Sequence, residues 1–556
     1  MVGFFQLFGI SFIFWVIIGC LRFIFETLRT LRDLPQSASR VNLLAASLAG
    51  VGLSTSLFFL VFIGFGFEEA MRFASTPALQ LSSLVIWFSC IGLGAFIAAR
   101  IYAHEPYMLS FAVALGTIAA TITALLYSPS TGAGLIPENI MLDLALFGAS
   151  LGFGFLGGHI ARSLNALERE RDAALRESTK AVRVAPEDVA IVIAAHNEEV
   201  TIGTTVESVL KFADVKNIFV GSDGSSDKTV DVVRSLGAHA DDIQPNRGKA
   251  GAIVYVLEKN KILDRYKAVF LMDADLKVNK DFYKYALPQF DDPNVVAVIG
   301  HAVSLWPKHY LPYWHLFFTA YRIRLWRVLQ FCLRYGQTWK YTNVSPIVPG
   351  GGSIYRSAAL KKIDIVAPGL IIEDFNMTFD IHHKKLGLIS FNPRAYVTNQ
   401  EPFSLRDYVK QIYRWYLGYF QTMRRHGIWP SWFFFSTAFF TLELFITSFL
   451  FAILPFLILE LLLGPREILT IGASFFGINI TLAGAIITVL LLDYVVTMVV
   501  AAIERKPMLL IYGPGFFFLR YVETWVFLYA MGIGLFTKPK MDGTWKSPKR
   551  VAYVKD

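Results

Sequence analysis

The stretch Ala268-Val269-Phe270-Leu271-Met272-Asp273-Ala274-Asp275 (AVFLMDAD) decides the fold. A short run of β-branched and large apolar residues is typical of a buried parallel strand, and this run ends in two carboxylates. In an open α/β sheet, ligands bind at the carboxyl ends of the strands, and two acidic side chains one residue apart can hold a hard divalent cation there. Asp is also common in solvated turns, so the triplet alone leaves both interpretations open.

Strands and helices alternate on both sides of this stretch. Residues 189–194 and 217–221 are rich in β-forming residues, and helical spacing covers residues 200–212, 228–236 and 250–259. Such alternation implies right-handed crossovers and a mainly parallel sheet. The sequence therefore predicts an α/β domain.

Both flanks of this domain are strongly apolar. The chain is 54% hydrophobic and 17% charged, values typical of a membrane protein. Apolar runs of bilayer-spanning length cover residues 2–20, 43–67, 81–99, 108–127 and 142–160, and after the domain residues 432–463, 468–503 and 508–536. The last run is interrupted by Gly513-Pro514-Gly515, which leaves the number of carboxy-terminal crossings open.

The distribution of charge predicts the orientation. Basic loops at residues 29–40 and 100–104 belong inside, so the positive-inside rule places the amino terminus outside and everything after Arg162 in the cytoplasm. The basic tail also belongs inside, which requires an even number of crossings after Pro430. The net charge of +9 fits anionic lipid and anionic substrates, and we expect no nucleic acid partner. The three scattered cysteines indicate neither a disulfide framework nor a metal cluster.

These patterns divide the chain into six regions. They are an amino-terminal transmembrane region (1–163, about five helices), a linker helix (164–188), the α/β domain (189–403), an interfacial helix (404–430), a carboxy-terminal transmembrane region (431–536) and a basic tail (537–556).

Polar loops follow several of the expected strands. Residues 221–227 (GSDGSSD) end one strand and also suit an ordinary helix cap, and residues 246–252 (NRGKAGA) could bind an anion through backbone N–H groups and Lys249. The glycines of residues 349–353 (PGGGS) either let a ligand approach the backbone or form a flexible turn. Glu373-Asp374 ends another apolar run but also suits a helix amino terminus.

Gln411, Arg414 and Trp415 share one helical face at positions i, i+3 and i+4. Together they can grip a phosphate and stack on a sugar, although Trp and Arg also anchor helices at a membrane interface. Residues 301–340 are rich in aromatics and Arg, and they either line a path for the acceptor or form a packing helix.

The ordered set of motifs resembles the processive inverting glycosyltransferases of family 2, the group of cellulose, chitin, hyaluronan and poly-N-acetylglucosamine synthases. The resemblance covers residues 189–415 and the membrane framing. It implies a GT-A-like (Rossmann-like) cytoplasmic domain inserted between multi-helix transmembrane regions. Five amino-terminal spans exceed the one or two common in the simplest synthases, and the extra ones could serve an accessory subunit or a homo-oligomer.

The resemblance also implies roles for the residues near the donor. Asp223 is expected to contact the base or ribose of the nucleotide, and Lys249 to belong to the same pocket. Asp273 and Asp275 match the DxD motif, which binds Mg²⁺ or Mn²⁺ on the donor diphosphate.

Two further matches concern catalysis and gating. Asp374, preceded by Glu373, matches the general base that deprotonates the acceptor hydroxyl. The tail around Trp545 and Lys546 resembles a mobile segment that covers the donor, although a basic tail lying on anionic lipid fits as well.

On the acceptor side, Gln411, Arg414 and Trp415 match the QxxRW motif, which holds the diphosphate and the acceptor sugar at the entrance to a membrane channel. We assign Gly351 and Gly352 to the same acceptor and diphosphate site.

The sequence therefore predicts a processive β-glycosyltransferase of the plasma membrane that extends a polysaccharide from a nucleotide sugar, UDP-activated, and translocates it. The rival enzyme adds one sugar to a polyprenyl phosphate or glycolipid and needs no QxxRW motif. A non-catalytic transporter or binding module would leave Asp273, Asp275 and Asp374 without purpose.

Overall fold

The computed structural model describes residues 77–101, 106–126, 140–306, 313–402, 404–463, 470–475 and 478–537, together with scattered residues before position 77. The chain forms two compact units. One contains Leu21–Glu177 and Gly472–Asn479, and the other contains Met1–Cys20, Ser178–Ile471 and Ile480–Asp556.

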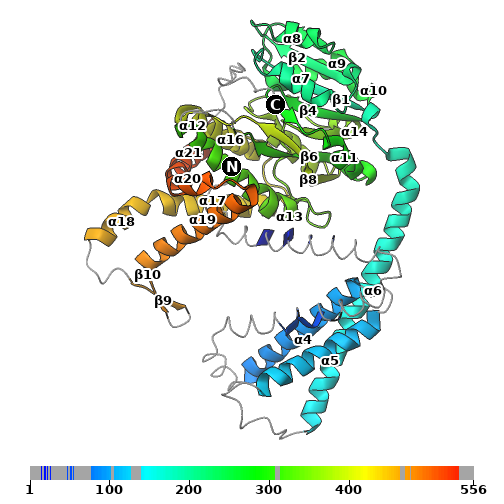
Figure 1. Cartoon of the computed structure of the whole chain (residues 1–556), viewed down its shortest axis with the longest axis vertical. Coiled ribbons are helices and arrows are strands. Elements are labelled where there is room, and N and C mark those ends of the chain that lie inside the picture. Colours follow the sequence, from blue (N-terminus) through cyan, green and yellow to red (C-terminus); the bar gives the residue numbers. More distant parts are fainter. Residues whose placement is uncertain are drawn as a thin grey trace. The chain divides into compact units, whose positions relative to one another are not determined.

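The first unit contains α4 (Pro77–Ile101), α5 (Pro106–Leu126) and most of α6 (Ile140–Val182) (Figure 1). Helices α4 and α5 occupy two of the expected apolar runs. The runs at residues 2–20 and 43–67 fall largely outside the described residues. Helix α6 is continuous over 43 residues, so the expected span and the linker helix are one element.

Small residues allow these helices to pack closely. A Cβ atom on Gly157 of α6 would lie 2.0 Å from the carbonyl oxygen of Gly92 on α4, and one on Gly158 would lie 1.9 Å from Ser110 Oγ on α5. Neither position has room for a side chain. Close packing through small residues is typical of helices in lipid.

The second unit is built on a mixed sheet with the strand order β3-β2-β1-β4-β7-β6-β8-β5. Strands β1 (Val189–Ala195), β2 (Ile218–Asp223), β3 (His239–Ile243) and β4 (Ala268–Asp273) are parallel; the sequence predicted β1, β2 and β4 but not β3. The other strands are β5 (Lys277–Val278), β6 (Val295–Ser304), β7 (Ser353–Arg356) and β8 (Leu388–Asn399). The expectation of a mainly parallel sheet is confirmed, since β6 and β8 run in the same direction as these four strands, whereas β7 runs antiparallel to both β4 and β6 and β5 runs antiparallel to β8. No simple βαβ crossover leads into β7, so nothing forces it to run parallel.

Helices cover both faces of the sheet, as the alternation within β1 requires. Ile191 and Ile193 pack in the same core as Val206 of α7 (Ile202–Val209), whereas Val192 packs with Val256 of α9 (Gly248–Lys259). The remaining helices around the sheet are α8 (Thr229–Ser235), α10 (Ile262–Arg265), α11 (Phe282–Ala286), α14 (Ser357–Leu360) and α15 (Glu373–His383).

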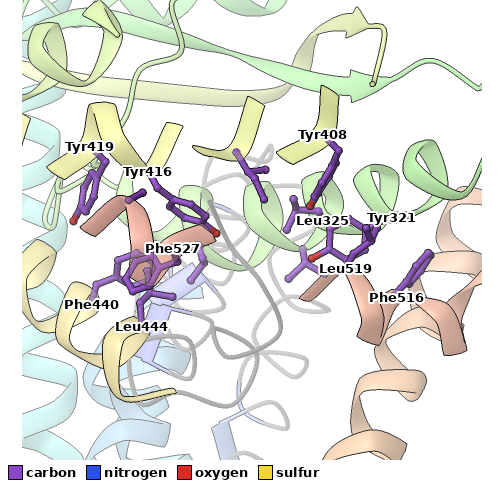
Figure 2. Close-up of a cluster of buried hydrophobic side chains, with 14 of the residues drawn as sticks. Tyr321, Leu325, Tyr408, Tyr416, Tyr419, Phe440, Leu444, Phe516, Leu519 and Phe527 are labelled. Atoms are coloured by element: carbon purple, nitrogen blue, oxygen red, sulfur yellow. The ribbon is translucent and has the colours of Figure 1, made fainter. Parts of the chain in front are cut away.

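A second group of helices packs beside the sheet in the same unit. It comprises α12 (Tyr313–Val328), the π-helical turn η6 (Leu329–Arg334), α13 (Tyr335–Gln337), α16 (Leu405–His426), α17 (Trp432–Ala452), α18 (Leu454–Leu463), α19 (Leu482–Glu504), α20 (Met508–Tyr512) and α21 (Phe516–Phe536). Figure 2 shows their shared core, where Tyr408 of α16 lies near Tyr321, and Tyr416 of α16 lies near Phe440 and Phe527.

Two segments of the described chain, Trp432–Phe456 and Met508–Phe536, are long and apolar enough to cross a membrane. The expected break at Gly513–Gly515 is a 3₁₀ turn between α20 and α21. Residues 468–503 do not form one long helix, because the strands β9 (Thr470–Phe475) and β10 (Ile478–Thr481) precede α19. The even number of crossings stays a prediction.

Buried ionic groups connect α12 to the carboxy-terminal helices. Asp493 of α19 accepts a hydrogen bond of 3.0 Å from Arg324 Nη1 and lies 2.9 Å from Arg520 Nη2 of α21. Tyr321 and Tyr408 both donate to Glu523 of α21. All of these side chains are buried, so each bond is protected from water.

We expect Asp493→Asn to destabilise the protein strongly, because it removes the charge that two buried guanidinium groups share. Breaking a buried ion pair on one side costs about 3–5 kcal/mol. Thermal unfolding in detergent measures the effect, and Asp242→Asn at an exposed position is the control. Equal melting temperatures for the two variants would contradict a stabilising role for this cluster.

Candidate active site

One cavity of about 670 Å³ opens in the second unit, between the carboxyl edge of β4, the start of α15 and one face of α16. Residues expected at the site line this cavity, and they come from segments far apart in the sequence. They are Lys249, Asp273, Asp275, Gly351, Glu373, Asp374, Gln411, Arg414 and Trp415. Asp223 and Gly352 do not line it, and Trp545 and Lys546 fall outside the described residues.

The register of the sheet brings the first of these residues together. Asp273, at the end of β4, pairs with Ala194 of β1, and Ala194 pairs with Gly221 of β2. The polar loops after these parallel strands therefore share one edge, as the sequence predicts.

Lys249 lies at the centre of a charged cluster. Its Nζ atom is 2.7 Å from Asp273 Oδ1 and 2.9 Å from Glu373 Oε1. Burial alone would lower the pKa of Lys249, but the neighbouring carboxylates Asp273 and Glu373 raise it above its ordinary value. Lys249 is therefore a permanent cation that connects the DxD strand to the start of α15.

The loop Gly350-Gly351-Gly352, called the glycine loop below, lies directly against this cluster because its residues have no side chains. A Cβ on Gly350 would lie 2.9 Å from Glu373 Oε1, and one on Gly351 would lie 2.3 Å from Asp273 Oδ2. Gly352 serves the fold instead, since its φ of +93° favours glycine and a Cβ there would meet Val397 at 2.9 Å. The loop is thus a close-fitting wall and not merely a turn.

Asp374 sits in the first turn of α15, deep in the cavity wall. Its Oδ1 accepts a hydrogen bond from the backbone N–H of Phe375 (2.8 Å), and its Oδ2 accepts one from Gly350 N–H (3.3 Å). Burial and the adjacent Glu373 raise the pKa of Asp374 to about 7, although Lys249 and the two backbone bonds act in the opposite direction. A carboxyl group with this pKa can accept a proton near neutral pH.

Asp223 is fully buried behind the cavity. Its Oδ1 accepts a 2.7 Å hydrogen bond from the backbone N–H of Arg247, and burial raises its pKa. In this structure its carboxylate holds the loop from which α9 begins and on which Lys249 stands. Its contact with a nucleotide stays a prediction.

The carboxylate oxygens of Asp273 and Asp275 fit a divalent cation whose other ligands are substrate phosphates and water. Within the described ranges no group of three or more His, Cys, Asp or Glu side chains could hold a metal. Asp273 and Asp275 offer carboxylate oxygens to the cavity, and Lys249 already contacts one oxygen of Asp273. Two carboxylates suit Mg²⁺ or Mn²⁺ when substrate phosphates and water complete the coordination.

On the opposite wall, residues that sequence reasoning did not assign hold the QxxRW side chains. Arg322 of α12 donates from Nη2 to Gln411 Oε1 (2.8 Å), and its guanidinium lies 4.6 Å from the ring centroid of Trp415. Trp326 lies 6.0 Å from Trp415 between ring centroids, and its indole N–H donates to Glu401 (2.9 Å). The only sequence signal for Arg322 and Trp326 is the aromatic and Arg-rich composition of residues 301–340.

That segment both packs and lines the cavity, and its role as a path for the acceptor stays a prediction. Arg322 and Tyr321 are completely buried, as expected of a packing helix, whereas Trp326, Leu329 and Leu333 line the cavity. Helix α12 and the turn η6 together therefore contribute both packing residues and cavity wall.

Asp374→Asn should raise stability at alkaline pH. The pKa of Asp374 is about 7 in the folded protein, above its ordinary value of 3.8. The carboxyl group therefore stabilises the fold fully below pH 3.8, and this contribution is lost as the pH rises through about 7. We expect the variant to melt at least ~2 °C above the unaltered protein at pH 8, with a smaller difference at pH 5. Asp231→Asn, at an exposed position, is the control. The same difference at both pH values would show that the pKa of Asp374 is not raised.

Part of the chain is similar to known glycosyltransferases. Residues 186–418 match the family described as "Glycosyltransferase like family 2". The chain is 26% identical over 245 residues to a poly-beta-1,6-N-acetyl-D-glucosamine synthase of Staphylococcus aureus, covering 43% of this chain and 56% of that protein. It is also 26% identical over 279 residues to the probable glycosyltransferase YdaM of Bacillus subtilis, covering 45% of this chain and 62% of that protein.

The chain thus spans less than two thirds of the length of these relatives. Among solved structures, it is similar to the mannosyltransferase PcManGT of Pyrobaculum calidifontis in complex with GDP-Man and Mn²⁺, with 16% identity, a TM-score of 0.39, and coverage of 67% of this chain and 97% of that one. Residues 186–418, which include the mixed sheet, are therefore the part of the chain that matches glycosyltransferase family 2.

Proposed function

We propose that the protein is a membrane-embedded, metal-dependent, inverting β-glycosyltransferase that polymerises a UDP-activated sugar and passes the product across the plasma membrane. One observation carries this proposal: Asp374, the Asp273/Asp275 pair and Trp415 line a single cavity. The similarity to a poly-beta-1,6-N-acetyl-D-glucosamine synthase supports polysaccharide as the product.

In the proposed reaction, the acceptor hydroxyl lies against Asp374 and the donor diphosphate lies beside Lys249 and Arg414. Asp374 takes the hydroxyl proton as the acceptor oxygen attacks the anomeric carbon, and the bond from that carbon to the diphosphate oxygen breaks. Lys249 and Arg414 stabilise the charge that develops on the departing nucleotide diphosphate. A bound Mg²⁺ or Mn²⁺ held by Asp273 and Asp275 would neutralise further charge on the diphosphate. A single displacement inverts the anomeric centre.

The acceptor site supports processive extension. Trp415 and Trp326 present two indole rings to the cavity, and sugars stack on such rings. Helix α16, which carries Trp415, packs through Tyr416 and Phe420 on Phe527 of α21, inside one of the two candidate spans. A product that leaves past Trp415 would therefore lie close to membrane helices.

A second candidate function is transfer to a lipid-linked acceptor. Val366 and Ile371 line the cavity yet are 54% and 40% exposed. Exposed aliphatic side chains at the mouth of a cavity suit a hydrocarbon chain better than a sugar. This observation favours a polyprenyl phosphate or glycolipid as the acceptor.

Incubation of the purified protein with radiolabelled UDP-sugars and Mn²⁺ tests the two candidates. Polymerisation predicts a product of high molecular weight that needs both the donor and the metal. A short, organic-soluble glycolipid as the only product would replace polymerisation with the second candidate, and no transfer from any nucleotide sugar would overturn both.

The pH dependence of transfer tests the role of Asp374. A general base is active when deprotonated, so the rate should rise about tenfold per pH unit up to about pH 7 and level off above it. Asp374→Asn should lower the rate by about 10²- to 10⁴-fold and leave UDP binding intact. A variant that loses UDP binding together with transfer would contradict the assignment of Asp374 as the base.

Gly351→Ala tests the close fit of the glycine loop. The new Cβ would lie 2.3 Å from Asp273 Oδ2 and must displace that carboxylate. A displacement of this kind costs about 100-fold in rate. Gly532→Ala is the matched control, because a Cβ at Gly532 meets nothing within 4 Å. If both variants transferred sugar at the unaltered rate, the carboxylate of Asp273 would not need its observed position.

A further inference from the structure

One continuous helical face lines the cavity opposite the charged cluster. Trp326, Leu329, Leu333 and Gln337 follow one another at intervals of three or four residues and all reach the cavity. The π-helical turn η6 (Leu329–Arg334) interrupts the α-helical pattern within this face and brings Arg334 to the cavity as well. Such π-helical turns are rare and are often found at functional sites.

Arg334 is a buried cation whose charge no neighbouring carboxylate balances. Its side chain is 8% exposed, and among the described residues no acidic group lies within ion-pair distance. Among the described residues its guanidinium donates one long hydrogen bond, of 3.4 Å from Nη1 to Gln330 Oε1, and it lies 5.9 Å from the ring centroid of Phe391. Burial lowers the pKa of Arg334 to about 10, so it remains charged at neutral pH.

The neighbouring groups do not balance this charge. His301 is neutral at pH 7, because burial, Arg327 and Arg334 lower its pKa to about 3. Arg327 is another cation, and its own partner is Glu504. The buried arginines of α12 differ from Arg334, since Arg322 faces Glu401 at 3.6 Å and Arg324 pairs with Asp493. An unbalanced buried charge is costly unless a ligand of opposite sign binds beside it.

We propose that Arg334 forms a subsite for an anionic group on the acceptor, either a carboxylate of a uronic acid or a phosphate attached to a sugar. A guanidinium presents paired N–H donors that match both of these groups. Gln337, one turn further along the same face, supplies an amide that can bond to neighbouring hydroxyls. This inference rests on the proposed transferase function and specifies the class of acceptor.

The arrangement of the walls places this anion on the acceptor and not on the donor. The groups suited to a donor diphosphate, Lys249, Asp273 and Asp275, lie at the edge of the sheet, whereas Arg334 belongs to the helical face that begins with Trp326 beside Trp415. An acceptor stacked on the two tryptophans would extend along this face toward Arg334.

Binding to the full-length protein in detergent tests the subsite without requiring turnover. The probes are a β-linked disaccharide that contains one glucuronate, the same disaccharide with its carboxylate reduced to an alcohol, and glucose 1-phosphate. UDP binding reports separately on the donor site. We expect at least one anionic probe to bind about tenfold or more tightly than the neutral disaccharide. In Arg334→Gln this preference should disappear, in Arg334→Lys part of it should remain, and the exposed control Arg394→Gln should keep all of it.

Each outcome decides the question. Preference for the glucuronate assigns a uronate acceptor, preference for glucose 1-phosphate assigns a sugar phosphate, and either supports the subsite. Equal binding of neutral and anionic probes, an unchanged preference in Arg334→Gln, or UDP binding without binding of any anionic probe would overturn it. If Arg334→Gln fails to fold, the preference of the unaltered protein and its decrease with salt still decide the matter. If the unaltered protein prefers an anionic probe but does not bind UDP, the result counts against the proposed transferase and not against the anion subsite.

Discussion

The candidate site depends on the confinement of three carboxylates around a single lysine. Asp273 and Glu373 contact Lys249 directly, and Asp374 lies beside them against the glycine loop. One positive charge cannot balance three carboxylates, so the cluster favours a further cation and holds the proton of Asp374 more tightly than water would. Both effects serve the proposed reaction, in which a metal binds the diphosphate and Asp374 takes a proton. The Gly350-Gly351-Gly352 loop is the condition for this confinement, because side chains there would collide with the cluster or with β8.

The second constraint is the buried polar network that connects the cavity to the apolar helices. Helix α12 bonds to Gln411 of α16 through Arg322, to α19 through Arg324 and to α21 through Tyr321. Removing one partner from such a network leaves a buried group unsatisfied, so these helices keep a fixed arrangement with the wall of the site. The position of Trp415 therefore follows from packing against apolar helices as much as from its own motif. This coupling suits an enzyme whose product must leave next to a membrane.

The sequence predicted the parts of this arrangement that depend on local signals. The first, second and fourth strands were recognisable as apolar runs that end in polar loops, and the carboxyl edge of a parallel sheet follows from their alternation with helices. Strands β3, β6 and β8 were missed although helices flank them, and β7 was missed because its antiparallel pairing depends on partners distant in the sequence. The positions of Arg322, Glu401 and Arg334 could not be predicted, because their importance lies in the charges around them and spacing does not encode those contacts. Asp223 was recognised from its motif, whereas its hydrogen bond from the backbone of the next loop was not foreseen, and its contact with a nucleotide stays a prediction.

The most direct test of the account is an experimental structure of the full chain with UDP and Mn²⁺. We expect the diphosphate and the cation between Lys249, Asp273 and Asp275, with open space for a sugar between Asp374 and Trp415. A nucleotide bound outside this cavity, or a cation without contact to either aspartate, would contradict it.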